Sequence, residues 1–110
     1  MSRKSLPAIT HLQFLVIGSL LSSERPGREI RKLIAAYGIK RSGPAFYQMM
    51  ARLERDGLVE GWYEPLIVRE QTVKERRYRI RPAGSKAWAA ARAFYEAVAS
   101  AAISQGWSNA

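Results

Sequence analysis

A helix that leads through a glycine directly into a basic hairpin occupies residues 42–81, and no other feature constrains the fold of this 110-residue chain as strongly. Apolar residues at helical spacing predict the buried face of this helix: Phe46, Met49, Met50 and Leu53. Gly57 follows, where a left-handed cap ends a helix. Beyond it the apolar period shortens to two. This change predicts two antiparallel strands, Val59 to about Val68 and Val73 to Arg81, joined near residues 69–72.

The second of these strands is strongly basic. Arg77, Arg79 and Arg81 alternate with Tyr78 and Ile80, so the arginines share one face of a half-buried strand. Between residues 69 and 81, six Lys and Arg stand against two Glu. We expect this face to meet few carboxylates and to contact phosphate groups. The alternative is a solvated strand face with cross-strand ion pairs.

The whole chain is basic as well, with a formal net charge of +9. Such a surplus favours a polyanionic partner, either nucleic acid or an anionic membrane surface. The alanine-rich stretch 87–103 contains Arg92 and Glu96, so we expect no membrane span there. With these features we expect a cytoplasmic protein.

The residues for catalysis or metal binding are scarce. The chain has no cysteine and one histidine, His11, so disulfides and zinc sites built on Cys and His are excluded. We find no paired carboxylates in a shared apolar setting and no phosphate-binding glycine loop. We therefore expect no enzyme, no cofactor and no metal, with His11 a surface residue without a special role.

Two further helices precede the one at 42–56. Thr10 and Gln13 have the spacing of a capping box that begins the first, which is apolar on nearly all sides and therefore needs cover on two sides. Residues 22–27 are rich in Ser, Pro and Gly and predict a turn. The second helix has a buried stripe of Ile30, Leu33, Ile34 and Tyr37, with Gly38 just past its end.

A last helix is predicted from Pro82 to about Ser104, with Gly106 as its stop. Its small residues allow another helix to approach closely. We expect that helix to come from a second chain, because three helices already supply the chain's own core. The residues predicted for this dimer interface are Phe14, Trp88, Ala91, Tyr95, Val98 and Ala102.

A helix followed by a basic hairpin is typical of a winged helix-turn-helix, and the chain resembles the PadR family of bacterial winged-helix transcriptional regulators over residues 9–86. The residues that carry the resemblance are Thr10, Gln13, Val16 (or Ile17), Gly18, Leu20 and Leu21 in the first helix, Gly27, Glu29 and Ile30 in the second, Ser42, Phe46, Tyr47, Met50, Arg52, Leu53, Glu54, Gly57 and Leu58 in the third, and Arg76, Tyr78, Ile80 and Gly84 around the hairpin.

The resemblance implies a mainly α fold with a small β-hairpin. Residues 5–82 would form a winged helix-turn-helix DNA-binding domain and residues 83–106 a long C-terminal dimerisation helix. It also implies a homodimer in which each last helix packs on the partner, as in the small subgroup with a single terminal helix. In such relatives, aromatic residues of that helix line a pore for a small hydrophobic effector. Trp88 and Tyr95 are the corresponding residues here, and simple interface packing is the alternative for them.

The DNA-binding residues are expected on the recognition helix 42–56, on the segment before it and on the basic wing 60–81. Gln48 has the chemistry to pair with adenine and Arg52 with a guanine or a phosphate, while Lys40 and Arg41 are expected on phosphates. The full predicted set is Lys40, Arg41, Ser42, Ala45, Tyr47, Gln48, Arg52, Lys74, Arg76, Arg77 and Arg79.

The sequence therefore favours a sequence-specific, dimeric regulator that represses transcription from an inverted-repeat operator on double-stranded DNA. Two alternatives stay open. One is an architectural or mobile-element protein that binds DNA with low specificity, and the other is a protein-interaction adaptor with an incidental basic surface.

Overall fold

The computed structural model describes residues 6–104, which form helices and strands in the order α1 (His11–Gly18), β1 (Arg25–Pro26), α2 (Gly27–Ala35), α3 (Gly43–Arg55), β2 (Val59–Val68), β3 (Gln71–Ile80) and α4 (Pro82–Ser104). The predicted class, a mainly α winged helix-turn-helix with a long C-terminal helix, is confirmed. Residue 5, at the predicted domain start, and residues 105 and 106, including the predicted stop at Gly106, lie outside the described residues.

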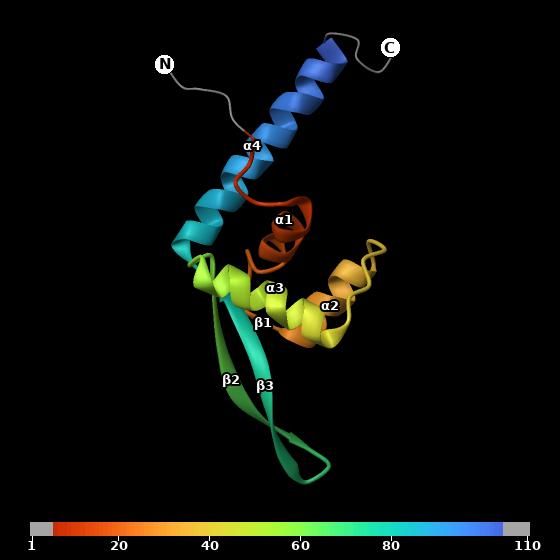
Figure 1. Cartoon of the computed structure of the whole chain (residues 1–110), viewed down its shortest axis with the longest axis vertical. Helices are drawn as coiled ribbons and strands as arrows, with labels where there is room; N and C mark the ends of the chain where they lie inside the picture. Colours follow the sequence, from red (N-terminus) through yellow and green to blue (C-terminus); the bar gives the residue numbers. More distant parts are fainter. Residues whose placement is uncertain (1–5, 105–110) are drawn as a thin grey trace.

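The molecule is elongated because two elements project from a small layer of helices (Figure 1). The β2–β3 hairpin extends from one side of this layer, and α4 extends from the other. The principal extents are 60 × 31 × 23 Å and the radius of gyration is 17.0 Å, whereas a compact chain of this length would have about 13 Å. Much of the hairpin and of α4 therefore lies away from the core.

The core sits where the helical layer meets the base of the sheet. Its buried hydrophobic residues are Ile9, Val16, Ile17, Leu20, Ile30, Ile34, Phe46, Met50, Leu53, Val59, Tyr78 and Ala91. The buried stripe predicted for α3 is confirmed at three positions, with Met49 half-buried. The stripe predicted for α2 is wrong at its end: Tyr37 is 70% exposed, because α2 stops at Ala35 and Ile39 packs on the core beyond the turn at Gly38.

Helix α1 begins with the predicted capping box, in which Thr10 and Gln13 exchange hydrogen bonds of 3.1 and 2.9 Å. It ends early, at Gly18, where α4 crosses it. A Cβ at position 18 would lie 2.9 Å from Nε1 of Trp88, so glycine lets the indole approach the backbone. The expectation that α4 would not pack on its own domain is thus wrong for its first half.

The sheet has three strands in the order β1-β3-β2, all antiparallel. The turn predicted at residues 22–27 is corrected in part, because Arg25 and Pro26 pair with Tyr78 and Arg77 as β1. A two-residue strand has no periodicity of its own and depends on its partner. The wing tip is a two-residue turn, Arg69 and Glu70, with φ values of 50° and 65°; positive φ at both central residues is the geometry that matches the twist of a hairpin.

The start of α4 is fixed by a close approach of two backbones. Gly84 is buried in the first turn of α4, and a Cβ there would collide with the carbonyl oxygen of Leu58. The Leu58 carbonyl also accepts a hydrogen bond of 3.0 Å from the Arg81 amide. This contact joins α4 to the segment between α3 and β2, and it sets the direction in which α4 leaves the sheet.

Candidate nucleic-acid interface

Helix α3 presents three faces, which follow from its helical periodicity. Its N-terminus is capped by Ser42, whose hydroxyl accepts a hydrogen bond of 3.2 Å from the Ala45 amide. One face is the core stripe already described. A second faces the hairpin and carries Tyr47, Ala51 and Glu54, which line a pocket shared with β2 and β3. The third face points outward and is the part of α3 that a groove of nucleic acid can reach.

The outward face is polar and cationic. Gln48, Arg52 and Arg55 are exposed on it at helical spacing. Ala45, Gln48 and Arg52 also line a groove of about 400 Å³ beside the first turn of α1. Arg55 was missed from the sequence, although its position seven residues after Gln48 places it on the same stripe. Tyr47, by contrast, leans toward α2 and is 39% exposed.

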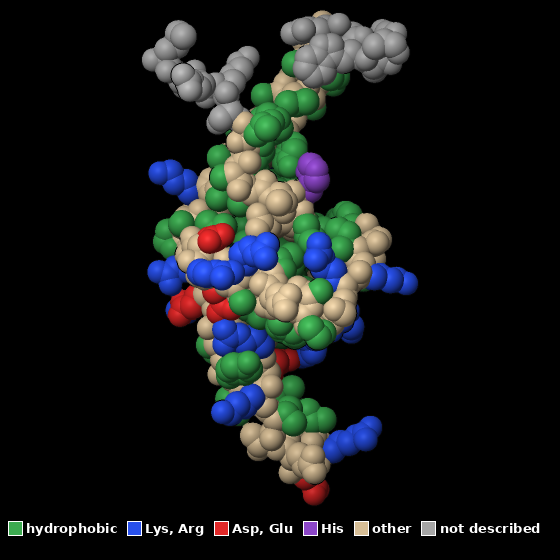
Figure 2. All heavy atoms as spheres, viewed as in Figure 1, with side chains coloured by type: hydrophobic (Ala, Val, Ile, Leu, Met, Phe, Trp, Pro, Cys, Tyr) green, Lys and Arg blue, Asp and Glu red, His purple; other side chains and the backbone are tan. Residues whose placement is uncertain are grey.

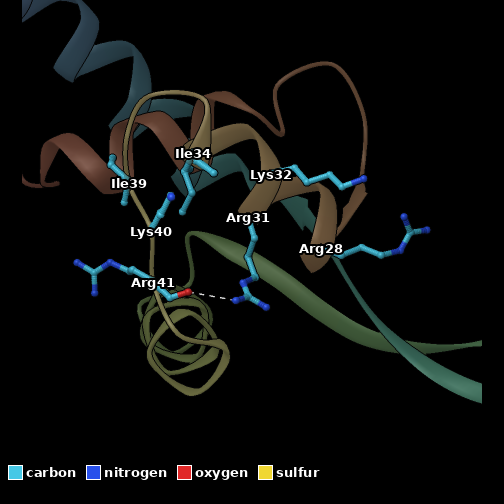
Figure 3. Close-up of a pocket in the computed structure, with 8 residues that line it drawn as sticks. Arg28, Arg31, Lys32, Ile34, Ile39, Lys40 and Arg41 are labelled. Atoms are coloured by element: carbon cyan, nitrogen blue, oxygen red, sulfur yellow. Dashed lines mark hydrogen bonds between the residues drawn. The ribbon is translucent and has the colours of Figure 1, made fainter.

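A cationic corner lies between α2 and the segment before α3, around a pocket of about 360 Å³ (Figure 3). Five cations and no carboxylate line it: Arg28, Arg31, Lys32, Lys40 and Arg41. Figure 3 shows these side chains spread along the corner rather than converging on one point. This arrangement suits successive phosphates of a strand better than one small anion.

Two of the corner's arginines are held in place. Arg31 donates a 3.1 Å hydrogen bond to the carbonyl of Arg41 and lies 6.0 Å from the centre of the Phe46 ring. Arg28 pairs with Glu75 at 2.6 Å. Lys32, Lys40 and Arg41 form no ion pair with any residue between 6 and 104. Like charges gathered without counterions are costly unless an anion joins them. Sequence reasoning missed Arg31 and Lys32 at this corner, although their place on the polar side of α2 was visible.

The wing arginines do not form the open face that the sequence predicted. Arg76 pairs with Glu54 at 2.5 Å, and Arg77 lies 3.2–3.4 Å from three carboxylates. Arg79 pairs with Glu60 at 2.8 Å and stacks on Trp62. The expectation of few neighbouring carboxylates is therefore wrong. Most of the acids come from elsewhere in the chain, from β2, from α3 and from the residue before β1: Glu24, Glu54, Glu60 and Glu64.

Other cations of the hairpin stay open. Arg69 at the tip and Lys74 on β3 are exposed and form no ion pair within the described part of the chain. Figure 2 shows Lys and Arg side chains gathered over the helical layer, with fewer along the hairpin. The electrostatic footprint is thus centred on α2, α3 and the segment between them.

The residues predicted for a dimer interface divide into two groups along α4. In the first half, Phe14 of α1 stacks on Trp88 at 5.3 Å and meets the edge of Tyr95 at 5.2 Å. The Tyr95 hydroxyl lies 3.0 Å from Nδ1 of His11, so the histidine has a partner that the sequence did not predict. Ala91 is fully buried within the chain. In the second half, Val98 is 39% exposed and Ala102 half-buried.

Other kinds of site find little support in the described residues. Between residues 6 and 104 no three His, Cys, Asp or Glu side chains gather as a metal site would require. Over the same range, no helix has the length and apolar character needed to cross a bilayer. The clefts described above are shallow and open, and the cationic corner has the most distinctive chemistry among them.

Comparison with known proteins gives no matching family model and no matching curated protein. Solved structures do match. A transcriptional regulator from Clostridium thermocellum has 21% identity and a TM-score of 0.67, over 86% of this chain and 88% of that chain. A PadR family transcription regulator from hypervirulent Clostridium difficile R20291 has 14% identity and a TM-score of 0.72, over 86% of this chain and 97% of that chain.

A third structure was solved with a ligand. Bacillus subtilis PadR in complex with operator DNA has 14% identity and a TM-score of 0.56, over 71% of this chain and 44% of that chain. At these identities the likeness is one of fold, and it covers most of this chain. The chain therefore has the winged-helix fold of the solved PadR-family transcription regulators.

Proposed function

We propose that the protein is a homodimeric, sequence-specific DNA-binding regulator that represses transcription from an inverted-repeat operator. The observation that carries this proposal is the outward face of α3, whose polar side chains lie beside the cationic corner. The fold shared with Bacillus subtilis PadR, which was solved with operator DNA, supports it. The expected cytoplasmic location rests on this function.

In this proposal α3 enters the major groove, which is wide enough to admit a helix. Gln48 reads adenine, and Arg52 contacts a guanine or a phosphate. Lys40 and Arg41 hold the backbone beside the groove, joined by the other cations of the corner. Ser42 and Ala45 complete the contact along α3, and Lys74 and Arg69 reach the flanking backbone from the wing.

Two substitutions separate backbone contact from base reading. Arg41→Ala should weaken binding to an operator duplex and to a scrambled duplex equally, by about tenfold, and lower the logarithmic salt slope by about 1.8, because each subunit of the dimer loses one phosphate contact. Gln48→Ala should leave the slope unchanged and reduce the preference for the operator by about 1–3 kcal/mol for each half-site. Fluorescence anisotropy with a duplex from upstream of the protein's own gene, at 50 and 200 mM salt, measures both.

Lys86→Ala is the matched control, because Lys86 is an exposed cation on α4 that lines neither the cationic corner nor the groove beside Gln48 and Arg52. It should change neither affinity nor slope. Equal binding of the wild-type protein to both duplexes would replace the proposal with a low-specificity architectural protein. No binding to either duplex would favour the interaction adaptor.

The dimer is inferred from the unequal lengths of α1 and α4. One stripe of α4 repeats at alternating spacings of four and three residues: Gly84, Trp88, Ala91, Tyr95, Val98 and Ala102. Its first four members face the chain's own α1 or the sheet. Helix α1 has 8 residues against 23 in α4, or about 12 Å against about 35 Å. Helix α1 ends before the stripe does, so it covers only the first part of it. We infer that a second α4 covers the rest, because alternating spacings of four and three residues are typical of the surface on which one helix packs against another. We call this stripe of α4 the seam.

Charging that seam should dissociate the dimer. Val98→Glu places a carboxylate in the proposed interface, where its desolvation is unfavourable. The mass measured by light scattering should then fall from two chains to one. Ser100→Glu makes the same change in charge at an exposed position off the seam and should leave the mass at two chains. A wild-type mass of one chain at micromolar concentration would contradict the dimer.

A small hydrophobic effector is the remaining part of the proposal. Phe14, Trp88 and Tyr95 form an aromatic cluster at the start of the seam, and a flat ligand would stack beside it, between subunits. Quenching of Trp88 fluorescence by flat aromatic compounds, absent in Trp88→Leu, would support this part.

A further inference from the structure

The side chain of Arg76 is enclosed between the wing and the recognition helix. Its guanidinium donates a 2.5 Å hydrogen bond to Glu54 of α3. It also lies 4.7 Å from the ring centre of Tyr63 and 5.7 Å from that of Tyr78. The side chains of Arg76 and Glu54 are each 24% exposed. Two aromatic faces and one carboxylate thus occupy the surroundings of this cation.

The Arg76–Glu54 ion pair occupies space that is left open because residue 61 has no side chain. Gly61 lies opposite Tyr78 in the β2–β3 register. A Cβ at position 61 would collide with the Glu54 carboxylate and come within 2.9 Å of Nη2 of Arg76. Because Gly61 has no side chain, Glu54 of α3 and Arg76 of β3 can come together as an ion pair.

The next residue, Arg77, lies on the opposite face of β3 and holds the hairpin there. It pairs with Glu24, which precedes β1, at 3.4 Å and with Glu64 of β2 at 3.2 Å. It also pairs with Glu75, which in turn pairs with Arg28 of α2 at 2.6 Å. The base of the hairpin is thus tied on one face to α3 and on the other to β1 and α2.

Beyond these ion pairs the hairpin is long, so a small rotation at its base produces a large displacement of its tip. From Arg76 to the tip at Glu70 is about 20 Å of extended strand. A change of about 10° at the base would therefore move the tip by about 3–4 Å, since strand residues advance about 3.3 Å each. A displacement of that size takes a side chain out of hydrogen-bond range of a phosphate. The angle between the base of the hairpin and α3 therefore determines whether the wing can contact the DNA backbone.

We propose that Arg76 and Glu54 form a clamp that sets the angle between the wing and the recognition helix, so that Arg76 is a positioning residue and not a phosphate contact. This inference rests on the proposed DNA-binding function. It replaces the direct role that the sequence predicts for Arg76, and Arg77 has the corresponding structural role on the other face. The wing then reaches the backbone through its open cations, Arg69 and Lys74.

Neutralising each partner distinguishes the clamp from a phosphate contact. Glu54→Gln removes a negative charge from the DNA-binding side, and charge alone would make DNA binding tighter. The clamp predicts the opposite: Glu54→Gln and Arg76→Gln each weaken operator binding by about tenfold and lower the salt slope by the same amount, because the displaced wing loses the phosphate contacts of Arg69 and Lys74. The control is Lys74→Gln, whose slope should fall by about 1.8, because each subunit loses one phosphate contact.

The charge-reversed pair tests the same point with both partners kept. Glu54→Arg combined with Arg76→Glu should restore affinity to within about threefold of wild type, because the pair forms again in the opposite sense. Each protein is first checked for an unchanged thermal midpoint. A salt slope that falls in Arg76→Gln but keeps its wild-type value in Glu54→Gln, or tighter binding by Glu54→Gln, would overturn the clamp.

A measurement without DNA separates failure of the clamp from failure of the proposed function. The chain has no cysteine, so Ala36→Cys and Gln71→Cys give two exposed label sites, one at the end of α2 and one near the wing tip. Labelled protein diluted with excess unlabelled protein reports the distance within one chain by electron spin resonance. The distribution should broaden in Arg76→Gln and narrow again in the charge-reversed pair. An unchanged distribution in Arg76→Gln overturns the clamp, whether or not the protein binds DNA.

Discussion

Gly84→Ala should destabilise the fold severely, with a loss of about 4 kcal/mol in the free energy of unfolding. Alanine is a better helix former than glycine, so propensity alone would predict a gain of about 1 kcal/mol. The added methyl group, however, would meet the carbonyl oxygen of Leu58. That atom belongs to the backbone and accepts the Arg81 amide. Relief therefore requires α4 to move away from the sheet.

Urea denaturation followed by circular dichroism measures this loss, and the thermal midpoint should fall by roughly 20 °C. The control is Ser85→Ala, the next residue in the same helical turn, which is exposed. It should be neutral or slightly stabilising. If the two variants unfold at the same urea concentration, the close packing of α4 on the Leu58 carbonyl is not a feature of the protein in solution.

Alkaline pH should weaken the fold through Tyr78. Burial of the ring, only 1% exposed, raises the pKa of Tyr78 from 10.0 to about 12, partly opposed by the nearby Arg76. The folded state thus holds the phenol proton more tightly than the unfolded state does. The stability from this group is complete below pH 10 and is lost as the pH rises from 10 to 12, by about 3 kcal/mol in all.

Tyr78→Phe isolates this effect because it removes the titrating group and keeps the ring. Its free energy of unfolding should fall less steeply than that of wild type between pH 10 and 12, while other titrating groups affect both proteins equally. Tyr63→Phe serves as the control, since Tyr63 is 64% exposed and lies on the same hairpin. Parallel pH curves for wild type and Tyr78→Phe would show that Tyr78 is accessible to solvent.

The elements whose structure depends on neighbours in sequence were predictable. The capping box of Thr10 and Gln13, the stripe of α3 and the glycine that ends it all depend on residues within one or two turns. The two-residue strand β1 could not be found this way, because it exists only through its pairing with β3. The packing of Trp88 on Gly18 joins residues 70 positions apart and was likewise not predictable.

Contacts between residues far apart in the sequence also explain why the prediction for the wing was wrong. Its local charge is strongly positive, and the prediction of an open basic face followed from that charge. The register of β2 and β3 then places Glu60 beside Arg79, and the folding of α3 places Glu54 beside Arg76. The net charge of the hairpin sequence therefore overstated the number of its cations that can bind a polyanion. It understated the corner, where Lys32 and Lys40 form no ion pair with any residue between 6 and 104.

The three faces of α3 also affect how related proteins could diverge. The outward positions 48, 52 and 55 lie apart from both the core and the hairpin, so single-codon changes there alter contacts with a ligand without disturbing what holds the helix. A duplicated gene could acquire a new target through a few such changes. Glu54, in contrast, should change only together with Arg76, and position 61 should stay glycine wherever the pair is kept, because a Cβ there would collide with it.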